Sequence, residues 1–265
     1  MRKTVILTVN VHGLGPEAAE APEAGLFGRF AHGRYTYRIG LSRLLDSLAA
    51  QRVKATFFWP VFEAERCRAL LERCLADGHE VAAHGNAFED HAGLGAGEGA
   101  LLETAHARLA ALAGVEPKGF RSPTGTLSPA TISILDRLGY AYDSSFLDDD
   151  APYSLAGDGG PRMVELPFAE GLADATHFRR RLTQARAEAY LVEELDALID
   201  ADSYACVTLH PRADLGVGRA ARLLMLERLI ARIRDRHGAA LRLCREVAEE
   251  CRQGGSVIWD GRPRS

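Results

Sequence analysis

Five short apolar runs in this chain end at, or are followed at once by, side chains that can do acid, base or metal chemistry. They are residues 4–9 before Asn10 and His12, 80–83 before His84, 118–120 before Arg121, 140–142 before Asp143, and 204–209 before His210. Helix-like stretches separate these runs, and strands that alternate with helices predict a parallel sheet with crossover helices. The chain is therefore expected to form an α/β fold such as a β/α barrel.

The five reactive positions share one place in such a fold. In a β/α barrel the carboxyl ends of all strands open onto one face, so residues far apart in the sequence converge there. A single histidine or arginine after a strand is more often a capped or solvated loop residue than a catalyst. Five in the same phase favour a common pocket instead, whose candidates are His12, His84, Arg121, Asp143 and His210.

Size and charge limit the function further. The 265 residues suffice for one large barrel or two small domains, and no Pro/Ser-rich linker divides them. We therefore expect one domain over residues 1–265. The formal net charge of −4 gives no support for nucleic acid or an anionic membrane as a partner. A small-molecule substrate is expected.

Five cysteines are scattered along the chain without a CxxC pair, which argues against a disulfide framework and for a reducing compartment. They are Cys67, Cys74, Cys206, Cys244 and Cys251. The stretch before the first predicted strand is too short for a signal peptide. No apolar run approaches the ~20 residues of a membrane span. These features predict a cytoplasmic protein.

Apolar spacing and end signals predict the helices that connect the strands. The predicted helices cover residues 39–51, 63–75, 98–113, 129–138 and 219–236. Further strands are expected over 55–59 and 163–167. The Gly- and Ala-rich segment 13–33 is too long for a simple turn and is expected to lie over the barrel mouth.

Six short motifs at the predicted strand ends carry a family resemblance. They are Lys54–Phe58, Gly78–Gly85, Gly119–Pro123, Tyr142–Ser145, Glu165–Pro167 and Leu209–Pro211. In this order they resemble the polysaccharide deacetylase family, the NodB-homology hydrolases. They are nearest to its branch with the Helicobacter-type peptidoglycan deacetylase and the metal-independent allantoinase. The resemblance implies a distorted (β/α)7-type barrel and hydrolysis of an acylated amine.

The resemblance also implies roles for individual side chains. In the family an Asp and two His hold a metal, a second Asp is the base, and a late His is the acid. On this pattern His210 is the acid. Arg121 orients or tunes the base, and Asp143 holds Arg121.

Two motifs depart from the family pattern. Asn10 and His12 stand where this branch has Asp-x-Asp, so an amide replaces the base and an imidazole replaces a metal ligand. Phe88 stands where the family has the second histidine of His-x-x-x-His. Zinc accepts imidazole ligands, so a zinc ion held by His12 and His84 is an alternative. His91 is a weaker ligand candidate, because it lies seven residues beyond His84.

A site of this kind is chemically competent without a metal. Imidazoles have an unperturbed pKa of ~6.5, so His12 and His210 could serve as base and acid near neutrality. Arg121 would then be available to an oxyanion. The side chains expected to contact the substrate are Asn10, Trp59, Phe88 and Glu165.

These observations predict a hydrolase of non-peptide C–N bonds that acts on a small amide, imide or N-acyl compound and needs no cofactor. One alternative is a zinc-dependent sugar or peptidoglycan N-deacetylase, which bound metal would distinguish. Another is a catalytically silent ligand-binding protein, which would show no turnover. A homo-oligomer is expected from the resemblance alone.

Overall fold

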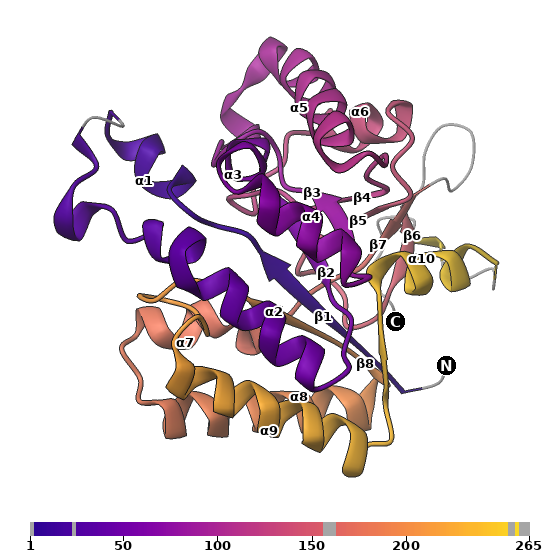
Figure 1. Cartoon of the computed structure of the whole chain (residues 1–265). Helices are drawn as coiled ribbons and strands as arrows, with labels where there is room; N and C mark the ends of the chain where they lie inside the picture. Colours follow the sequence, from indigo (N-terminus) through magenta and orange to yellow (C-terminus); the bar gives the residue numbers. More distant parts are fainter. Residues whose placement is uncertain (1–2, 23–24, 156–162, 254–257, 260–265) are drawn as a thin grey trace.

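Strand β1 (Thr4–Asn10) lies inside a curled sheet in the computed structural model of this chain (Figure 1). The structure describes residues 3–22, 25–155, 163–253 and 258–259. β1 is rich in Thr and Val, which suit a pleated surface, and its residues 4–9 are buried. The other strands are β2 (Thr56–Trp59), β3 (Glu80–Ala83), β4 (Gly119–Phe120), β5 (Tyr142–Asp143), β6 (Tyr153–Leu155), β7 (Met163–Glu165), β8 (Tyr204–Leu209), β9 (Ala240–Arg242) and β10 (Ile258–Trp259).

The strands follow the order β10-β6-β7-β5-β4-β3-β2-β1-β8, and β9 pairs with the first half of β1. Neighbouring strands are parallel, apart from the antiparallel pair of β6 and β7. β8 and β10 form the two ends of this order, so the sheet curls into an open barrel. The predicted α/β fold of the distorted (β/α)7 type is confirmed, and incomplete closure is its distortion.

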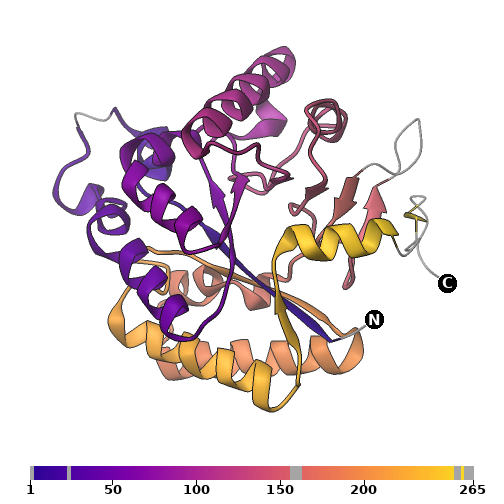
Figure 2. The same ribbon diagram turned by 45° about the vertical axis from the view of Figure 1, so that its right-hand side comes forward.

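Helices surround the curled sheet, and most of them cover its outer face (Figure 2). They are α1 (Gly15–Glu20), α2 (Leu41–Ala50), α3 (Val61–Arg66), α4 (Arg68–Ala76), α5 (Glu98–Ala113), α6 (Thr131–Arg137), α7 (Asp174–Arg179), α8 (Gln184–Ala201), α9 (Ala220–Asp235) and α10 (Cys244–Gln253). The five predicted helices are present, although the helix expected over 63–75 breaks at Cys67 into α3 and α4. Among the described residues, no helix is both long and apolar enough to cross a membrane.

Side chains along each strand alternate between two apolar clusters, one outside the sheet and one inside it. Leu7 and Val9 of β1 belong to the outer cluster with the helices, whereas Ile6 belongs to the inner cluster. Successive side chains of a strand point to opposite faces, so Thr8 and Asn10 follow Ile6 to the inside. This phase decides which side chains reach the barrel mouth.

Helix α10 closes the end of the barrel opposite to the reactive residues. The backbone N–H of Cys244 donates to Thr56 Oγ1 at 3.0 Å, and that of Arg245 donates to Glu80 Oε2 at 3.1 Å. Thr56 and Glu80 are the first residues of β2 and β3. The helix therefore covers the amino ends of the strands, and the carboxyl ends remain for the chemistry.

Candidate active site

The reactive side chains meet at the carboxyl ends of the strands, as the strand phase predicted. The rings of His12 and His84 stack with their centroids 4.9 Å apart, and the ring of His210 lies 5.4 Å from that of His12. Asn10 at the end of β1 lies between Arg121 and His210. The site is nearly closed, because the exposed fractions of His12, His84 and His210 are 5%, 0% and 6%.

Arg121 binds side chains from several strand ends at once. It is 2% exposed, and its Nε and Nη2 donate to the backbone oxygen and the hydroxyl of Ser144 at 2.8 and 2.7 Å. Nη1 donates to Asn10 Oδ1 at 3.1 Å and to the hydroxyls of Thr8 and Thr208 at 2.9 and 3.3 Å. The guanidinium is thus occupied by protein acceptors, which corrects the expectation that it serves an oxyanion. Its place in the site is to position Asn10.

Asp143 binds Ser145 and Glu165 rather than Arg121, which corrects the contact that the resemblance implied. Its carboxylate accepts from the N–H and the hydroxyl of Ser145, both at 2.9 Å. Asp143 lies opposite Glu165 in the register of β5 and β7, and the two carboxyl groups hydrogen-bond each other. Both side chains are fully buried. Glu165 is therefore held by its strand neighbour and does not face a substrate, contrary to the prediction.

Burial and close approach favour one shared proton in the pair of Asp143 and Glu165. Burial raises the pKa of Asp143 to about 6. Burial and the nearby Asp143 charge raise the pKa of Glu165 well above its usual value. Two adjacent carboxylates in a buried site do not both ionise. Protonated Glu165 therefore donates to Asp143, and Asp143 holds Ser145, whose hydroxyl accepts from the Ser122 N–H at 2.9 Å.

The Asp143–Glu165 pair is expected to make the protein less stable as the pH rises. Replacing Glu165 by glutamine should remove most of this pH dependence. Folding raises both pKa values, so the pair's contribution is complete below the unfolded values of 3.8 and 4.5 and is lost as the pH rises through the folded values. The glutamine amide donates to Asp143 without needing a proton. Urea titration measures the unfolding free energy at about pH 5 and at about pH 8. Between these two pH values it should fall by about 1–3 kcal/mol less in Glu165→Gln than in the wild type.

The matched control is Glu193→Gln, because Glu193 is exposed on α8. This change should alter the unfolding free energy by less than about 0.5 kcal/mol at both pH values. If Glu165→Gln kept the pH dependence of the wild type, the two carboxyl groups would not share a proton in the folded protein.

His12 and His84 form a pair of uncharged imidazoles. His84 Nδ1 donates to the Arg121 backbone oxygen at 2.7 Å, so its Nε2 must accept from His12 Nε2, 3.0 Å away. Burial lowers the pKa of His84 to about 3. Burial, followed by the charge of neighbouring imidazoles, lowers the pKa of His12 well below 6.5. A base becomes charged when it takes a proton, so this environment makes His12 a poor base.

These two imidazoles do not complete a zinc site. Catalytic zinc takes three protein ligands, whereas the apolar ring of Phe88 stands edge-on to His12 at 5.1 Å. His91 faces Glu98 instead, with Nδ1 3.3 Å from the carboxylate. Within the described segments, no three His, Cys, Asp or Glu side chains are placed to hold one metal ion. The residues present therefore do not fit the metal that the family resemblance implies.

His210 is held by a residue that the sequence pattern did not reveal. Asp174, the first residue of α7, accepts from His210 Nδ1 at 2.6 Å and from the His210 backbone N–H at 2.9 Å. Its Oδ2 also accepts from the Val217 N–H at 2.9 Å. The available signal was an acidic residue in the first turn of a helix, which is too common to indicate function.

Trp59 points away from the site, which corrects its prediction as a substrate contact. Its neighbour Phe58 lies inside the barrel, where the Arg121 guanidinium carbon is 4.3 Å from the ring centroid. Because side chains alternate along a strand, Trp59 belongs to the outer cluster and is fully buried. Asn10 and Phe88 are half-buried at the mouth, where a substrate can reach them.

The segment after β1 is tied to the barrel rim beside the histidines. Glu63 accepts from the backbone N–H groups of Gly13 and Gly15 at 2.9 and 2.7 Å. Arg212, two residues after His210, donates to the Gly13 backbone oxygen and to Glu17, both at 2.7 Å. A Cβ at position 13 would lie 2.4 Å from the Glu63 carboxylate, so this contact requires glycine. The beginning of segment 13–33 thus lies at the mouth, as expected.

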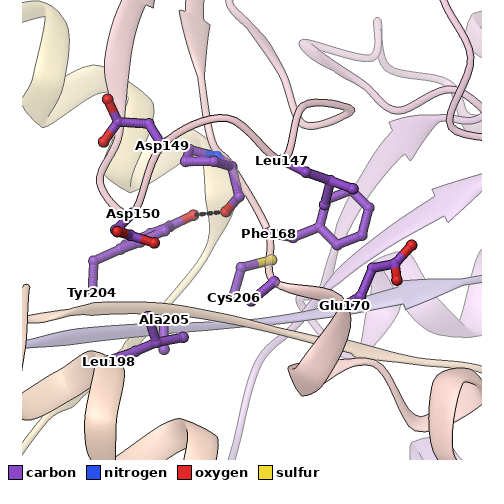
Figure 3. A pocket seen from close by; sticks show the side chains of 11 residues that line it. Leu147, Asp149, Asp150, Phe168, Glu170, Leu198, Tyr204, Ala205 and Cys206 are labelled. Carbon is purple, nitrogen blue, oxygen red and sulfur yellow. Dashed lines mark hydrogen bonds between the residues drawn. The ribbon is translucent and has the colours of Figure 1, made fainter. Parts of the chain in front are cut away.

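The structure also has a surface pocket of about 240 Å³ that none of the three histidines lines (Figure 3). It lies between the segment that follows β7 and the start of β8. Its wall includes Phe168, whose ring centroid is 5.0 Å from the Arg121 guanidinium carbon, and Cys206, whose sulfur is 3.5 Å from Nη2. Arg121 itself does not line the pocket, and it also binds Asn10.

Comparison with known proteins connects this chain to a family. Residues 36–142 match the family described as polysaccharide deacetylase, which confirms the resemblance. The peptidoglycan deacetylase of Helicobacter pylori is 29% identical over 126 residues, which cover 46% of this chain and 43% of that protein. The chain spans less than half of the length of the curated relatives that it matches.

Two solved structures share the fold over most or all of the chain. The Mycobacterium smegmatis protein titled "putative polysaccharide deacetylase" is 29% identical, with a TM-score of 0.88 over 100% of this chain and 96% of that one. The allantoinase PuuE is 21% identical, with a TM-score of 0.79 over 94% of this chain and 90% of that one. The motifs indicate a branch with a Helicobacter-type peptidoglycan deacetylase and an allantoinase. A protein of the first kind is similar to this chain in sequence, and one of the second kind is similar in fold.

Proposed function

We propose that this chain, a relative of the polysaccharide deacetylases, hydrolyses a non-peptide C–N bond in a small amide, imide or N-acyl compound. The observation that carries the proposal is the pair of Asp174 and His210 at the barrel mouth, with 2.6 Å between carboxylate and Nδ1. Such a carboxylate orients an imidazole and stabilises its charged form, which proton transfer in amide hydrolysis requires.

The burial of the site supports a small substrate. His210 is 6% exposed and His12 is 5% exposed, so little surface is open for a long polysaccharide chain. A small compound needs only its reacting group to reach His210. Phe88 offers it an apolar wall, and Asn10 offers an amide beside the reacting imidazole.

His210 Nε2 is the atom through which protons move in this proposal. Asp174 keeps a proton on Nδ1, so Nε2 is left to exchange with water and substrate. Arg121 holds the Asn10 amide next to Nε2. Asp143 and Glu165 do not contact the reacting atoms in this proposal. Asp143 holds the Ser145 hydroxyl, which in turn accepts from the backbone N–H of Ser122, the residue after Arg121.

We also propose that the reaction needs no bound metal and takes place in the cytoplasm. The imidazole pair lacks a third donor, since Phe88 stands where the family has a histidine. Cys67, Cys74, Cys206 and Cys244 are free thiols, which agrees with a reducing compartment. Assembly into a homo-oligomer stays an expectation from the resemblance.

Turnover of a panel of small amides, imides and N-acyl amines, measured with and without a metal chelator, tests the proposal. We expect hydrolysis of at least one of these classes, at a rate that the chelator does not change. N-acetylated sugar oligomers and peptidoglycan fragments form the comparison arm. Activity that is lost with chelator and returns with zinc would contradict the metal-free site, and preference for the oligomers would contradict the small substrate.

A further inference from the structure

Asn10 lies between Arg121 and His210, and these neighbours determine which way its amide faces. Arg121 Nη1, which can only donate, is 3.1 Å from Asn10 Oδ1, and Asn10 Nδ2 is 3.5 Å from His210 Nε2. The reverse orientation would set the amide N–H groups against the guanidinium N–H groups. The side chain of Asn10 therefore presents donors, and no acceptor, to His210.

The other nitrogen of His210 is fixed by Asp174. This carboxylate accepts from Nδ1 at 2.6 Å and from the backbone N–H groups of His210 and Val217, both at 2.9 Å. Nδ1 consequently keeps its proton. Nε2 then holds a lone pair toward Asn10, since a proton on Nε2 would face the N–H groups of the amide.

We propose that Asn10 is a positioning residue that makes His210 the base of the reaction. The family pattern makes the residue at position 210 an acid, which requires a proton on Nε2 before the reaction begins. An aspartate at position 10 would accept from a protonated Nε2 and favour that state, whereas the Asn10 amide opposes it. The reaction step rests on the proposed function, but the placement of the protons rests on the contacts of Asn10 and Asp174.

One imidazole then performs both proton transfers. Nε2 takes a proton from water while the water oxygen bonds to the carbonyl carbon. The proton passes from Nε2 to the departing nitrogen as the C–N bond breaks, which leaves a carboxylic acid and an amine and restores His210. This order explains how the site works with an amide at position 10 and with His12 disfavoured as a base.

Charged and titratable groups surround His210 on several elements of the mouth. Asp174 of α7, His12 after β1 and His84 after β3 act on His210 directly. Three arginines act through these neighbours: Arg121 holds Asn10, Arg212 acts on His12, and Arg222 of α9 lies near Asp174. Asn10 is the residue placed against Nε2 itself, so exchanging it tests the assignment with these other groups unchanged.

Nitrogen NMR of the full chain labelled with nitrogen-15 shows which nitrogen of His210 is protonated, independently of turnover. At about pH 7 we expect the proton of wild-type His210 on Nδ1 alone. Asn10→Asp places an acceptor against Nε2, so its spectrum should gain the signal of a proton on Nε2. Asn10→Ala removes the amide that opposes a proton on Nε2 without adding an acceptor, so its Nε2 should be protonated more often than in the wild type and less often than in Asn10→Asp. His237, which Asp196 holds at 2.7 Å, is the internal reference.

Two results would overturn the proposal. One is a proton on Nε2 of wild-type His210 at this pH, and the other is an Asn10→Asp spectrum with the wild-type Nε2 signal. If the nitrogen signals behave as expected but no amide is hydrolysed, the proposed function fails and the proton assignment stands. If Asn10→Asp does not fold, an Asn10→Ala spectrum identical to that of the wild type would overturn the role of the amide by itself.

Discussion

Replacing His210 by alanine is expected to lower kcat/KM about 10²–10⁴-fold, the range for loss of a group that transfers protons. The effect should be large because Nε2 is proposed to act in both halves of the reaction. Asp174→Asn should also lower the rate strongly, since an amide no longer fixes the proton on Nδ1. Initial rates on an amide that the wild type hydrolyses measure both effects.

His32→Ala is the matched control for the histidine change, because His32 is an exposed residue ahead of α2. Its rate should equal that of the wild type. Circular dichroism of His210→Ala would show that the fold is kept. Full activity in a folded His210→Ala variant would place the chemistry outside the barrel mouth and end the proposal.

Arg121→Ala is expected to lower the free energy of unfolding by about 3–5 kcal/mol. The change removes a buried guanidinium that donates to Ser144, Asn10, Thr8 and Thr208, and it leaves Asn10 Oδ1 and the Ser144 backbone oxygen without this donor. Folded domains are stable by only about 5–15 kcal/mol. Urea titration measures the loss, and activity should fall with it because Asn10 is no longer held.

Two further variants separate the causes of this effect. Arg121→Lys keeps the charge but loses the fork of N–H groups, so it should recover part of the stability and little of the Asn10 contact. Arg137→Ala, at an exposed position of α6, should change the unfolding free energy by less than about 0.5 kcal/mol. If Arg121→Ala were as stable as this control, the strand ends would hold together without the guanidinium.

The sequence by itself determined the strands, their phase and the side chains that follow them. Apolar runs such as 4–9 and 204–209 are local properties of the chain, and they predict strands without any knowledge of the partners. Parallel strands bring their carboxyl ends to one face. His12, His84, Arg121, Asp143 and His210 were therefore predicted as one pocket before the fold was known. The structure brings the three histidines together and links Arg121 to them through Asn10, whereas Asp143 binds Ser145 and Glu165.

Only the tertiary structure decided what these side chains bind. Asp174 reaches His210 because α7 packs beside β8, and Glu165 meets Asp143 because β7 pairs with β5. Trp59 turned outward because the phase of β2 puts Phe58 inside. Hydrogen-bond partners and burial depend on how segments distant in the sequence approach each other, and local patterns do not encode that approach. For this reason the sequence showed where the site is, and the packing decided which of its residues can carry a proton.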